Sequence, residues 1–580
     1  MPTRILRRSC LVLMMALSIV QTPTGVRRPH SDRAHRIPAP PASGAGETAT
    51  MPGVPEIYYP TMQHLSVRWP ISGDSNNNGV VSVRFRQAGG EWRENLQLKR
   101  IPAGESSGFS WRNQHSGSVF HLEPGTTYEV ELNLVDPDGG SRQQTLIGTT
   151  RPVPTSQVSG RIRKVSPASF GRAFETAAPG EIFELAAGNY GPFRARRSGL
   201  ADRPIVIRST GKASFSRFDL NDQKHLVIDR VFIKGTVQIQ GCEDIALLHL
   251  TIDASKTDYG VMARGGSGCR NCYIADSTIT GPLMRAWDGP ALPRYGDATG
   301  IQLSGPGTVV EHNLVQGFDD GIAFSEDDRD ANQYSIDIIG NEIRHSVDDG
   351  IEMDFCLGNC RSIGNRITNG LCGISFQPAL GEPAYAIDNS LYNVAFEAFK
   401  LKRNSVGAVI FHNTVLKNGD ALSANTPRPI SQTWIANNLL IGGPGETNAG
   451  YESGNGSIVE LGSADDSNYV DYNAYGSETQ RFEGNYGRLR FHRFSELLDL
   501  TPNRHSVQVF FNSTFAKTPP YPKPAVPGRS PQDLRLRSGS AAIDSGLALP
   551  NVNDGYSGAA PDLGAYEFGS ELPVYGPRPR

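Results

Sequence analysis

The chain has 580 residues, and its 56 lysines and arginines against 59 aspartates and glutamates give a formal net charge of −3 at pH 7. This near balance argues against a general nucleic-acid-binding protein, which needs a strong surplus of basic residues. Hydrophobic residues make up 38% of the sequence, which argues against a fully disordered or fibrous chain. The 63 glycines are scattered, and together with 40 prolines they indicate many turns and many short strands.

The first residues predict export from the cytoplasm. Three arginines precede an apolar run at residues 10–20, the pattern of a secretory signal, which we place at residues 1–22. The run falls short of the ~20 apolar residues that span a bilayer, although an uncleaved anchor is the alternative. Residues 23–53 are rich in Pro, Ala, Ser and Gly and predict a linker. We therefore expect a secreted protein, periplasmic or extracellular, with no stable membrane insertion.

Six cysteines remain after the predicted signal, which permits disulfides in an exported chain. Their spacing favours local disulfides or buried free thiols, and it leaves the connectivity open. Structural zinc is the alternative, but no histidine stands at matching spacing near either close pair. The six are Cys242, Cys269, Cys272, Cys356, Cys360 and Cys372.

Residues 54–150 predict a small two-sheet sandwich. Hydrophobic and polar residues alternate at 65–69, 81–86 and 128–132, with turn-forming clusters between them. The segment Leu-Glu-Pro-Gly-Thr-Thr-Tyr that ends at Tyr128 resembles the signature of fibronectin type III domains, and Trp69 stands where that family keeps its core tryptophan. The resemblance implies a spacer or carbohydrate-contact module.

A repeat follows, and it predicts the fold of the rest of the chain. Asparagines that precede apolar residues recur at an interval of 28 and then at four intervals of 24. This period with short strand-like runs is typical of a parallel β-solenoid, in which stacked turns bury the interior side chains. The asparagines predict an internal hydrogen-bonded ladder. They are Asn313, Asn341, Asn365, Asn389, Asn413 and Asn437.

An amphipathic helix at residues 167–178 would cap the open apolar end of the solenoid. The segments at 181–190 and 204–208 resemble the opening of right-handed parallel β-helix proteins of the pectate-lyase-like superfamily, most closely the alginate lyase and chondroitinase B group. Residues 539–567 resemble the closing segment of secreted bacterial β-helix proteins. We therefore expect an all-β protein with a right-handed parallel β-helix at 160–568 and a tail at 569–580.

The strand that ends near residue 354 carries the candidate chemistry. If Ile351 and Met353 point inward, Glu352 and Asp354 point outward, because side chains alternate along a strand. Stacked strands lie about 4.8 Å apart, so Lys400 is expected two turns, roughly 10 Å, from Glu352, with room for a sugar ring between them. The same register places these residues on the outer face: Gln302, Ser304, Ala323, Ser325, Ser375, Gln377, Lys400 and Lys402.

The acidic residues of this strand resemble the metal-binding stretch of the alginate lyase and chondroitinase B group. The resemblance implies Ca²⁺-assisted β-elimination of an acidic, uronate-containing polysaccharide, because a cation neutralises the substrate carboxylate and makes the C5 proton removable. Asn359 stands where the family has its catalytic lysine. The residues implied are Asp320, Asp349, Glu352 and Asp354 for Ca²⁺ and Lys400, Lys402 and Glu352 for catalysis.

Two other functions remain open. An inverting glycoside hydrolase would use paired carboxylates such as Glu352 and Asp354, and a non-catalytic glycan-binding or surface protein would use none. Asp-Gly pairs before strands are also ordinary turn chemistry, and the outward acids could be plain solvated positions. The expected substrate-binding residues are Gln302, Gln377, Arg264 and Trp287, the last in an insertion at 281–299 that would form a cleft wall.

Overall fold

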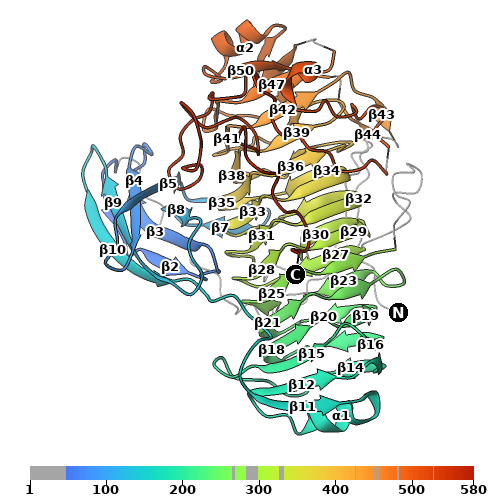
Figure 1. The fold of residues 1–580 in the computed structure, drawn as a ribbon. Coiled ribbons are helices and arrows are strands. Elements are labelled where there is room, and N and C mark those ends of the chain that lie inside the picture. Colours follow the sequence, from blue (N-terminus) through green and yellow to red (C-terminus); the bar gives the residue numbers. More distant parts are fainter. Residues whose placement is uncertain are drawn as a thin grey trace, which may run out of the picture.

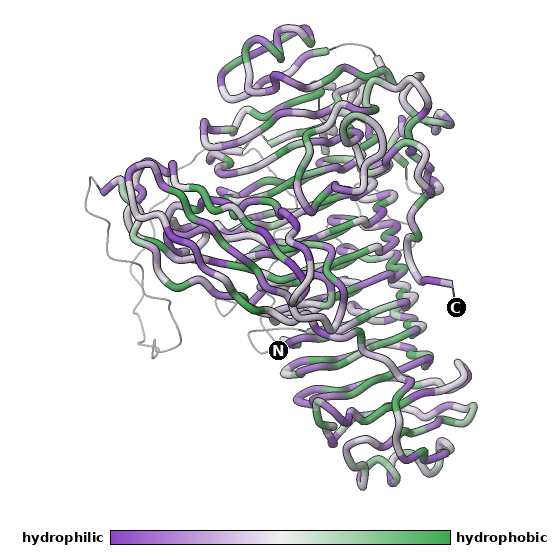
Figure 2. Tube along the Cα trace, turned by 60° about the vertical axis from the view of Figure 1, so that its left-hand side comes forward, coloured by the Kyte–Doolittle hydropathy of each residue, from purple (hydrophilic) through white to green (hydrophobic). Residues whose placement is uncertain are grey.

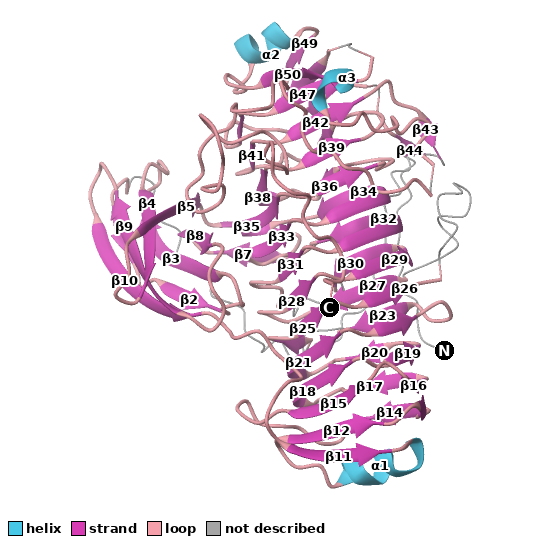
Figure 3. Cartoon of the chain, viewed as in Figure 1, coloured by secondary structure: helices cyan, strands magenta, loops and turns pink. Residues whose placement is uncertain are grey.

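The computed structural model describes residues 47–263, 268–282, 298–325, 332–424, 426–448, 451–454, 456–479, 482–526 and 528–579. The predicted signal, Arg264 and Trp287 lie outside these ranges. Figure 1 shows an elongated stack of strands with a smaller β-domain packed against its side. Helices lie only near the two ends of the stack (Figure 3). Within the described ranges, no helix is both long and apolar enough to cross a membrane.

The smaller domain is an antiparallel sandwich with strand order β1-β3-β8-β5-β4-β9-β10 and with β2 paired to β3. Residues 93–98 of β5 pair with β4 and residues 99–101 pair with β8, so this strand joins the two layers. The buried Trp69 lies in the core between them. The strands are β1 (Thr50–Pro52), β2 (Glu56–Tyr58), β3 (Leu65–Gly73), β4 (Val80–Gln87), β5 (Arg93–Ile101), β8 (Gln114–Val119), β9 (Thr127–Val135) and β10 (Arg142–Thr149), with a hairpin of β6 (Gly104–Ser106) and β7 (Phe109–Trp111).

The sandwich begins before residue 54, where the sequence placed its start. Strand β1 lies inside the expected linker at 23–53 and pairs with the end of β3, Thr50 opposite Gly73. Thr50 is also anchored by Asp136, whose carboxylate accepts from its backbone N–H at 2.9 Å and from its hydroxyl at 2.5 Å. Composition alone suggested a linker here because a three-residue edge strand is too short to show alternation.

The stack is a parallel β-solenoid, as the repeat predicted. Every strand pairs with its counterpart from the next turn, and the first wall is a 14-stranded sheet. Its strands are β11 (Arg161–Val165), β12 (Glu181–Leu185), β15 (Ile205–Ser209), β18 (Lys224–Asp229), β21 (Cys242–Leu248), β24 (Cys269–Arg270), β25 (Tyr273–Ala275), β28 (Val309–Glu311), β31 (Asp337–Ile339), β33 (Cys360–Ile363), β35 (Leu380–Ile387), β38 (Val406–Phe411), β41 (Trp434–Ala436) and β46 (Tyr469–Asp471).

The other walls are two strand ladders that merge into one 20-stranded sheet, because β32 and β34 are long enough to belong to both. One ladder consists of β13 (Gly188–Asn189), β16 (Ala213–Phe215), β19 (Phe232–Lys234), β22 (Thr251–Asp253), β26 (Thr278–Thr280), β29 (Leu314–Phe318), β32 (Glu342–Glu352), β34 (Arg366–Phe376), β36 (Ser390–Tyr392), β39 (Thr414–Leu416), β42 (Leu439–Gly442), β47 (Ala474–Ser477) and β50 (Val507–Phe510). The other runs through β14 (Pro192–Arg194), β17 (Arg217–Asp219), β20 (Val237–Gln238), β23 (Tyr259–Met262), β27 (Thr299–Leu303) and β30 (Asp320–Phe324) to β32, β34 and β37 (Phe399–Leu401).

The solenoid interior follows from the alternation of apolar and polar residues along these strands, visible in Figure 2. One continuous apolar core extends from the first turns to the last. The expected asparagine ladder is present, with each side-chain carbonyl accepting from the backbone N–H of the preceding asparagine at 2.8–3.0 Å. Its sixth member is Asn438, and not Asn437 as predicted; Asn437 adopts a φ of +59° and donates to His412 instead.

Helix α1 (Pro167–Glu175) closes the first turn, as predicted from its amphipathic pattern, and buries Phe170 and Phe174 in the solenoid core. The far end carries a sheet of β40 (Leu422–Ser423), β45 (Val459–Leu461), β48 (Gly484–Tyr486) and β49 (Leu489–Phe491), the pair β43 (Thr447–Asn448) and β44 (Tyr451–Glu452), and the helices α2 (Phe494–Leu500) and α3 (Phe511–Thr514). The C-terminal tail returns along the outside of the stack to its middle (Figure 1), where Arg578 pairs with Asp276 at 2.6 Å.

The cysteines are local disulfides and buried thiols, as the spacing predicted. Cys269 bonds Cys272 and Cys356 bonds Cys360. Cys242 and Cys372 are free and buried. The zinc alternative is therefore wrong for the two close pairs.

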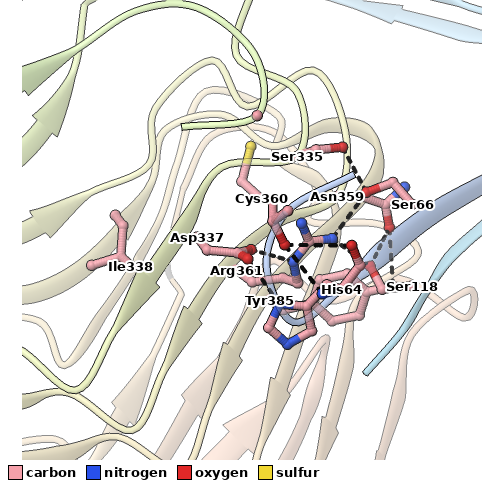
Figure 4. Close-up of polar contacts among 12 residues, drawn as sticks. His64, Ser66, Ser118, Ser335, Asp337, Ile338, Asn359, Cys360, Arg361 and Tyr385 are labelled. Atoms are coloured by element: carbon pink, nitrogen blue, oxygen red, sulfur yellow. Dashed lines mark hydrogen bonds and ion pairs between the residues drawn. The ribbon is translucent and has the colours of Figure 1, made fainter. Parts of the chain in front are cut away.

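A buried polar network fixes the sandwich to the 14-stranded wall (Figure 4). Arg361 donates from Nε to Asp337 at 2.5 Å and from Nη1 to the hydroxyls of Ser66 and Ser118 at 3.0 and 2.9 Å. The other oxygen of Asp337 lies 2.8 Å from Nδ1 of His64. Burial alone would raise the pKa of Asp337, but Arg361 and His64 hold it below its ordinary value. We call these five residues the docking network, together with Glu382 and its partners, which are described next.

A second carboxylate, Glu382, completes the docking network. It accepts from the hydroxyls of Tyr58 at 2.5 Å and Ser116 at 2.8 Å and from Nε2 of Gln114 at 3.0 Å. Asn359 donates to the Tyr58 oxygen at 2.6 Å. Because these contacts join strands of the sandwich to strands of the solenoid, the two domains form one packed body. Asn359 thus has a structural role.

Candidate functional site

Five residues form one ladder across the turns of the solenoid, in the register that the sequence predicted. The strand pairings place Gln302 beside Ala323, Ala323 beside Glu352, Glu352 beside Ser375, and Ser375 beside Lys400. Their chain neighbours, such as Ile301, Ile322, Ile351, Ile374 and Phe399, lie in the interior core, so the ladder points away from it. We call Gln302, Ala323, Glu352, Ser375 and Lys400 the outward ladder.

The outward ladder is nevertheless buried, unlike the plain solvated positions that the sequence left open as an alternative. Gln302 is 0% exposed, Lys400 2% and Glu352 7%. Asp354 is also 0% exposed. Charged groups are rarely buried unless they are paired, since each loses its hydration. The burial therefore argues against plain surface charge at these positions.

Three carboxylates converge at this place. Asp320, Asp349 and Glu352 each contribute an oxygen, and these oxygens lie within 4.8 Å of one another. The backbone N–H of Asp349 donates to the Asp320 carboxylate at 3.2 Å. Asp320 and Asp349 occupy equivalent positions, each just before a glycine and an inward isoleucine. Because both aspartates lie within strands of adjacent coils, β30 and β32, the stacking of the solenoid brings their carboxylates together.

Lys400 bonds directly to this group of acids. Its Nζ lies 2.5 Å from Oδ2 of Asp349, and both side chains are almost completely buried. Lys400 lies two strands from Glu352, as predicted, but its amine reaches Asp349 and so closes the expected gap on that side. A lysine side chain is long and flexible, and in a site of low dielectric its charge is stabilised by reaching the carboxylate. We call Asp320, Asp349, Glu352 and Lys400 the acid–lysine cluster.

Burial and charged neighbours together shift the pKa of Asp349. Burial raises the pKa of its carboxyl well above the ordinary value, Lys400 opposes this shift, and the nearby Asp348, Asp320 and Asp354 add to it. Oδ1 of Asp349 has no hydrogen-bond partner within the described ranges. Lys400 therefore pairs with one oxygen of Asp349, and the other oxygen is left without a hydrogen bond from any described residue.

Asp354 is held apart from the three converging carboxylates. Its Oδ1 accepts from the Ser375 hydroxyl at 2.6 Å and from the backbone N–H of Gln377 at 2.7 Å. Its Oδ2 and both amide atoms of Gln302 find no partner among the residues that the structure describes. Ser375 therefore orients one oxygen of Asp354, and the other is buried without a described partner.

Lys402 contacts a different carboxylate. Its Nζ lies 2.9 Å from Oε2 of Glu397 and 4.7 Å from the centre of the Phe396 ring. Burial raises the pKa of Glu397, against the opposing effect of Lys402, Lys400 and Lys417. The structure does not bring Lys402 to Asp349 as it does Lys400.

Sequence reasoning missed Glu397 and Lys417. Glu397 stands two residues before the inward Phe399, the offset at which Asp349 precedes Ile351, so position in the repeat could have identified it. Lys417 is fully buried and donates to the backbone carbonyls of Asn418 and Asp420 at 2.6 and 2.9 Å. Burial lowers its pKa to about 8. No repeat signal points to Lys417.

The acid–lysine cluster fits a divalent cation such as Ca²⁺. Ca²⁺ takes carboxylate and other oxygens at about 2.3–2.6 Å, so ligand oxygens of one ion lie within about 5 Å of one another. The oxygens of Asp320, Asp349 and Glu352 meet this condition at 4.8 Å. The unpartnered Oδ1 of Asp349 is an acceptor that a cation would satisfy.

Comparisons with known proteins add no family assignment. A scan against protein-family models found no match, and a search of curated proteins found no relative. The function therefore has to be argued from the site itself.

Proposed function

We propose that this protein cleaves an acidic, uronate-containing polysaccharide by cation-assisted β-elimination. The observation that carries the proposal is the acid–lysine cluster: three carboxylate oxygens within 4.8 Å of one another and a lysine amine 2.5 Å from one of these carboxylates. Membership of the pectate-lyase-like superfamily, near the alginate lyase and chondroitinase B group, belongs to the same proposal. So do the right-handed sense of the solenoid, the fibronectin type III identity of the sandwich, and export.

Each residue has a role in this reaction. Asp320, Asp349 and Glu352 would hold the cation, which supplies neutralisation of the substrate carboxylate and so acidifies the C5 proton. Lys400 takes the C5 proton, the C4–O4 bond breaks as the C4–C5 double bond forms, and the same ammonium returns a proton to O4. Asp349 positions the amine, while Gln302 and the free oxygen of Asp354 would contact the sugar.

The geometry favours this reaction over inverting hydrolysis. An inverting hydrolase needs an acid and a base about 6.5–9.5 Å apart, so that a water molecule fits between the substrate and the base. The oxygens of Asp320, Asp349 and Glu352 are closer than that, at 4.8 Å or less. Hydrolysis by another carboxylate pair, such as Glu352 with Asp354, remains the alternative chemistry.

A non-catalytic glycan-binding or surface protein is the second candidate. It is favoured by the 2% exposure of Lys400 and its close pairing with Asp349, which together suit a purely structural ion pair. Catalysis requires that a substrate reaches this buried amine. The two candidates therefore differ in whether Lys400 is accessible to a ligand.

The deciding experiment incubates the full chain with alginate, polygalacturonate and glycosaminoglycans. A lyase generates unsaturated uronates that absorb in the ultraviolet, whereas a hydrolase generates reducing ends without this absorbance. We expect turnover that chelation abolishes and Ca²⁺ restores, and that is lost in Lys400→Met and Glu352→Gln. Reducing ends without absorbance would support the hydrolase, and no turnover on any substrate would support the binding protein.

A further inference from the structure

A cleft at the far end of the solenoid lies outside the acid–lysine cluster. It has a volume of about 770 Å³ and is bordered by the loop after β40, the loop after β45, the β48–β49 turn and the segment after α2. Three arginines line it, Arg428, Arg488 and Arg504, against a single acidic residue, Asp466. The lining thus carries a surplus of positive charge in a protein whose net charge is −3.

The backbone holds two of these arginines toward solvent. Arg428 stands between Pro427 and Pro429, whose rings restrict the loop. Arg488 is in the two-residue turn between β48 and β49, where Gly487 has a φ of +55°, as hairpin turns of this length require. Both arginines are exposed, and neither forms an ion pair with a described residue.

The third arginine and a tyrosine complete the polar part of the cleft. Arg504 donates to the carbonyls of Leu498 and Asp499 at 2.8 and 3.0 Å, which holds it at the end of α2. Tyr486 is only 6% exposed, and its hydroxyl finds no partner among the described residues. An unpartnered buried hydroxyl is unfavourable, so Tyr486 is suited to donate to a ligand. Burial raises its pKa to about 12, which keeps it protonated at neutral pH.

The rest of the lining is apolar. Leu489 and Leu500 line the cleft and are 45% and 47% exposed, and prolines lie beside them. A uronate sugar matches this mixture, because its carboxylate suits the planar fork of arginine, its hydroxyls suit a phenol, and its ring C–H faces suit aliphatic side chains.

The sheet that borders the cleft adjoins the strand of Lys400. Strand β40 contacts β37, the strand of Lys400, and β45 and β48 follow β40 in the same sheet. Strands of successive turns are about 4.8 Å apart, so the cleft begins within a few sugar lengths of Lys400.

We infer that this cleft is a binding site for carboxylated saccharides, with Arg428 and Arg488 contacting carboxylates and Tyr486 a hydroxyl. The inference rests on the substrate class of the proposed function and is independent of its catalysis. It requires no cation, which distinguishes the cleft from the acid–lysine cluster.

The test measures binding of a galacturonate hexamer to the full-length protein by calorimetry, in chelator and on the Lys400→Met background, so that neither turnover nor a cation contributes. We expect weaker binding by about fivefold to tenfold for Arg428→Gln or Arg488→Gln, more for the pair, and a smaller loss for Tyr486→Phe. Arg490→Gln is the matched control, because this exposed arginine lies on the same hairpin but does not line the cleft.

The outcomes separate this site from the proposed reaction. Binding that is lost in the arginine pair and retained in Arg490→Gln supports the cleft even if no polysaccharide is cleaved. Equal binding of a neutral maltose-type hexamer, or unchanged binding in the arginine pair, would overturn it. Preferential binding of a hexaglutamate peptide would also overturn it, since the ligand would then be an acidic peptide.

Discussion

Among the places where the protein buries charge, the docking network and the acid–lysine cluster differ in how their charges are paired. In the docking network, Arg361 faces Asp337, and Arg68 lies 3.7 Å from Glu382. In the acid–lysine cluster, Lys400 faces Asp349 together with several further carboxylates. In the first, each of these carboxylates faces an arginine, whereas in the second several carboxylates lie around the ion pair of Lys400 and Asp349.

The unpartnered atoms show the same contrast. In the docking network they are Nη2 of Arg361, which is a donor, and Nε2 of His64, whose role depends on the tautomer. Around the acid–lysine cluster they include the acceptor oxygens Oδ1 of Asp349 and Oδ2 of Asp354. A balanced network stabilises one arrangement of two domains. An acceptor-rich one is suited to receive a cation or a proton donor, and this difference separates structure from candidate function.

The largest expected effect concerns activity. On the polysaccharide that is turned over, Lys400→Met should lower kcat by about 10²–10⁴-fold, because the group that transfers the proton is removed. Lys402→Met is the matched control, since Lys402 pairs with Glu397 and not with Asp349. Initial rates measured by ultraviolet absorbance test this. If activity were lost in Lys402→Met and retained in Lys400→Met, the proton transfer would be assigned to Lys402.

The next effect concerns stability. Arg361→Met should lower the free energy of unfolding by about 3–5 kcal/mol, because it leaves Asp337 buried without its partner. Lys400→Met should cost less, since the raised pKa of Asp349 lets that carboxyl take up a proton instead. Urea unfolding measures both, with Arg344→Met as a control at a partly exposed pair. Equal losses of unfolding free energy in Arg361→Met and Lys400→Met would contradict this difference between the docking network and the acid–lysine cluster.

Cation binding should stabilise one site only. A Ca²⁺ concentration of about 100 times the dissociation constant adds about 2.7 kcal/mol to the unfolding free energy, seen as a higher melting temperature. We expect Asp320→Asn combined with Glu352→Gln to abolish this shift and Asp337→Asn to preserve it. A shift that survives in the first variant would place the cation elsewhere.

The smallest effect is a pH dependence of the docking network. The folded-state pKa of Asp337 is depressed, so its stabilisation is present above the unfolded pKa of about 3.9 and is lost as pH falls through the folded value. Burial lowers the pKa of His64, so protonation also favours unfolding below about pH 6.5. Asp337→Asn should flatten the acidic part of the stability profile, measured by urea unfolding. An unchanged slope would assign the acid sensitivity to other groups.

Local patterns predicted the solenoid and the register of the outward ladder. Alternation places Ile351 inward and Glu352 outward without knowledge of any distant contact, and the 24-residue interval aligns Asn341 with Asn365 and Asn389. The pattern failed where the interval changed. Asn437 and Asn438 are adjacent asparagines, and only the stacking of the next turn selects Asn438 for the ladder.

The sequence by itself determined the repeat, the capping helix and the residues that share a face, because these depend on periodicity along the chain. Only the tertiary structure decided that the outward ladder is buried, that Lys400 reaches Asp349, and that Tyr58 meets Glu382 across 324 residues. Those contacts depend on side-chain reach and on the packing of segments far apart in the chain. Neither side-chain reach nor the packing of distant segments produces a periodic pattern in the sequence.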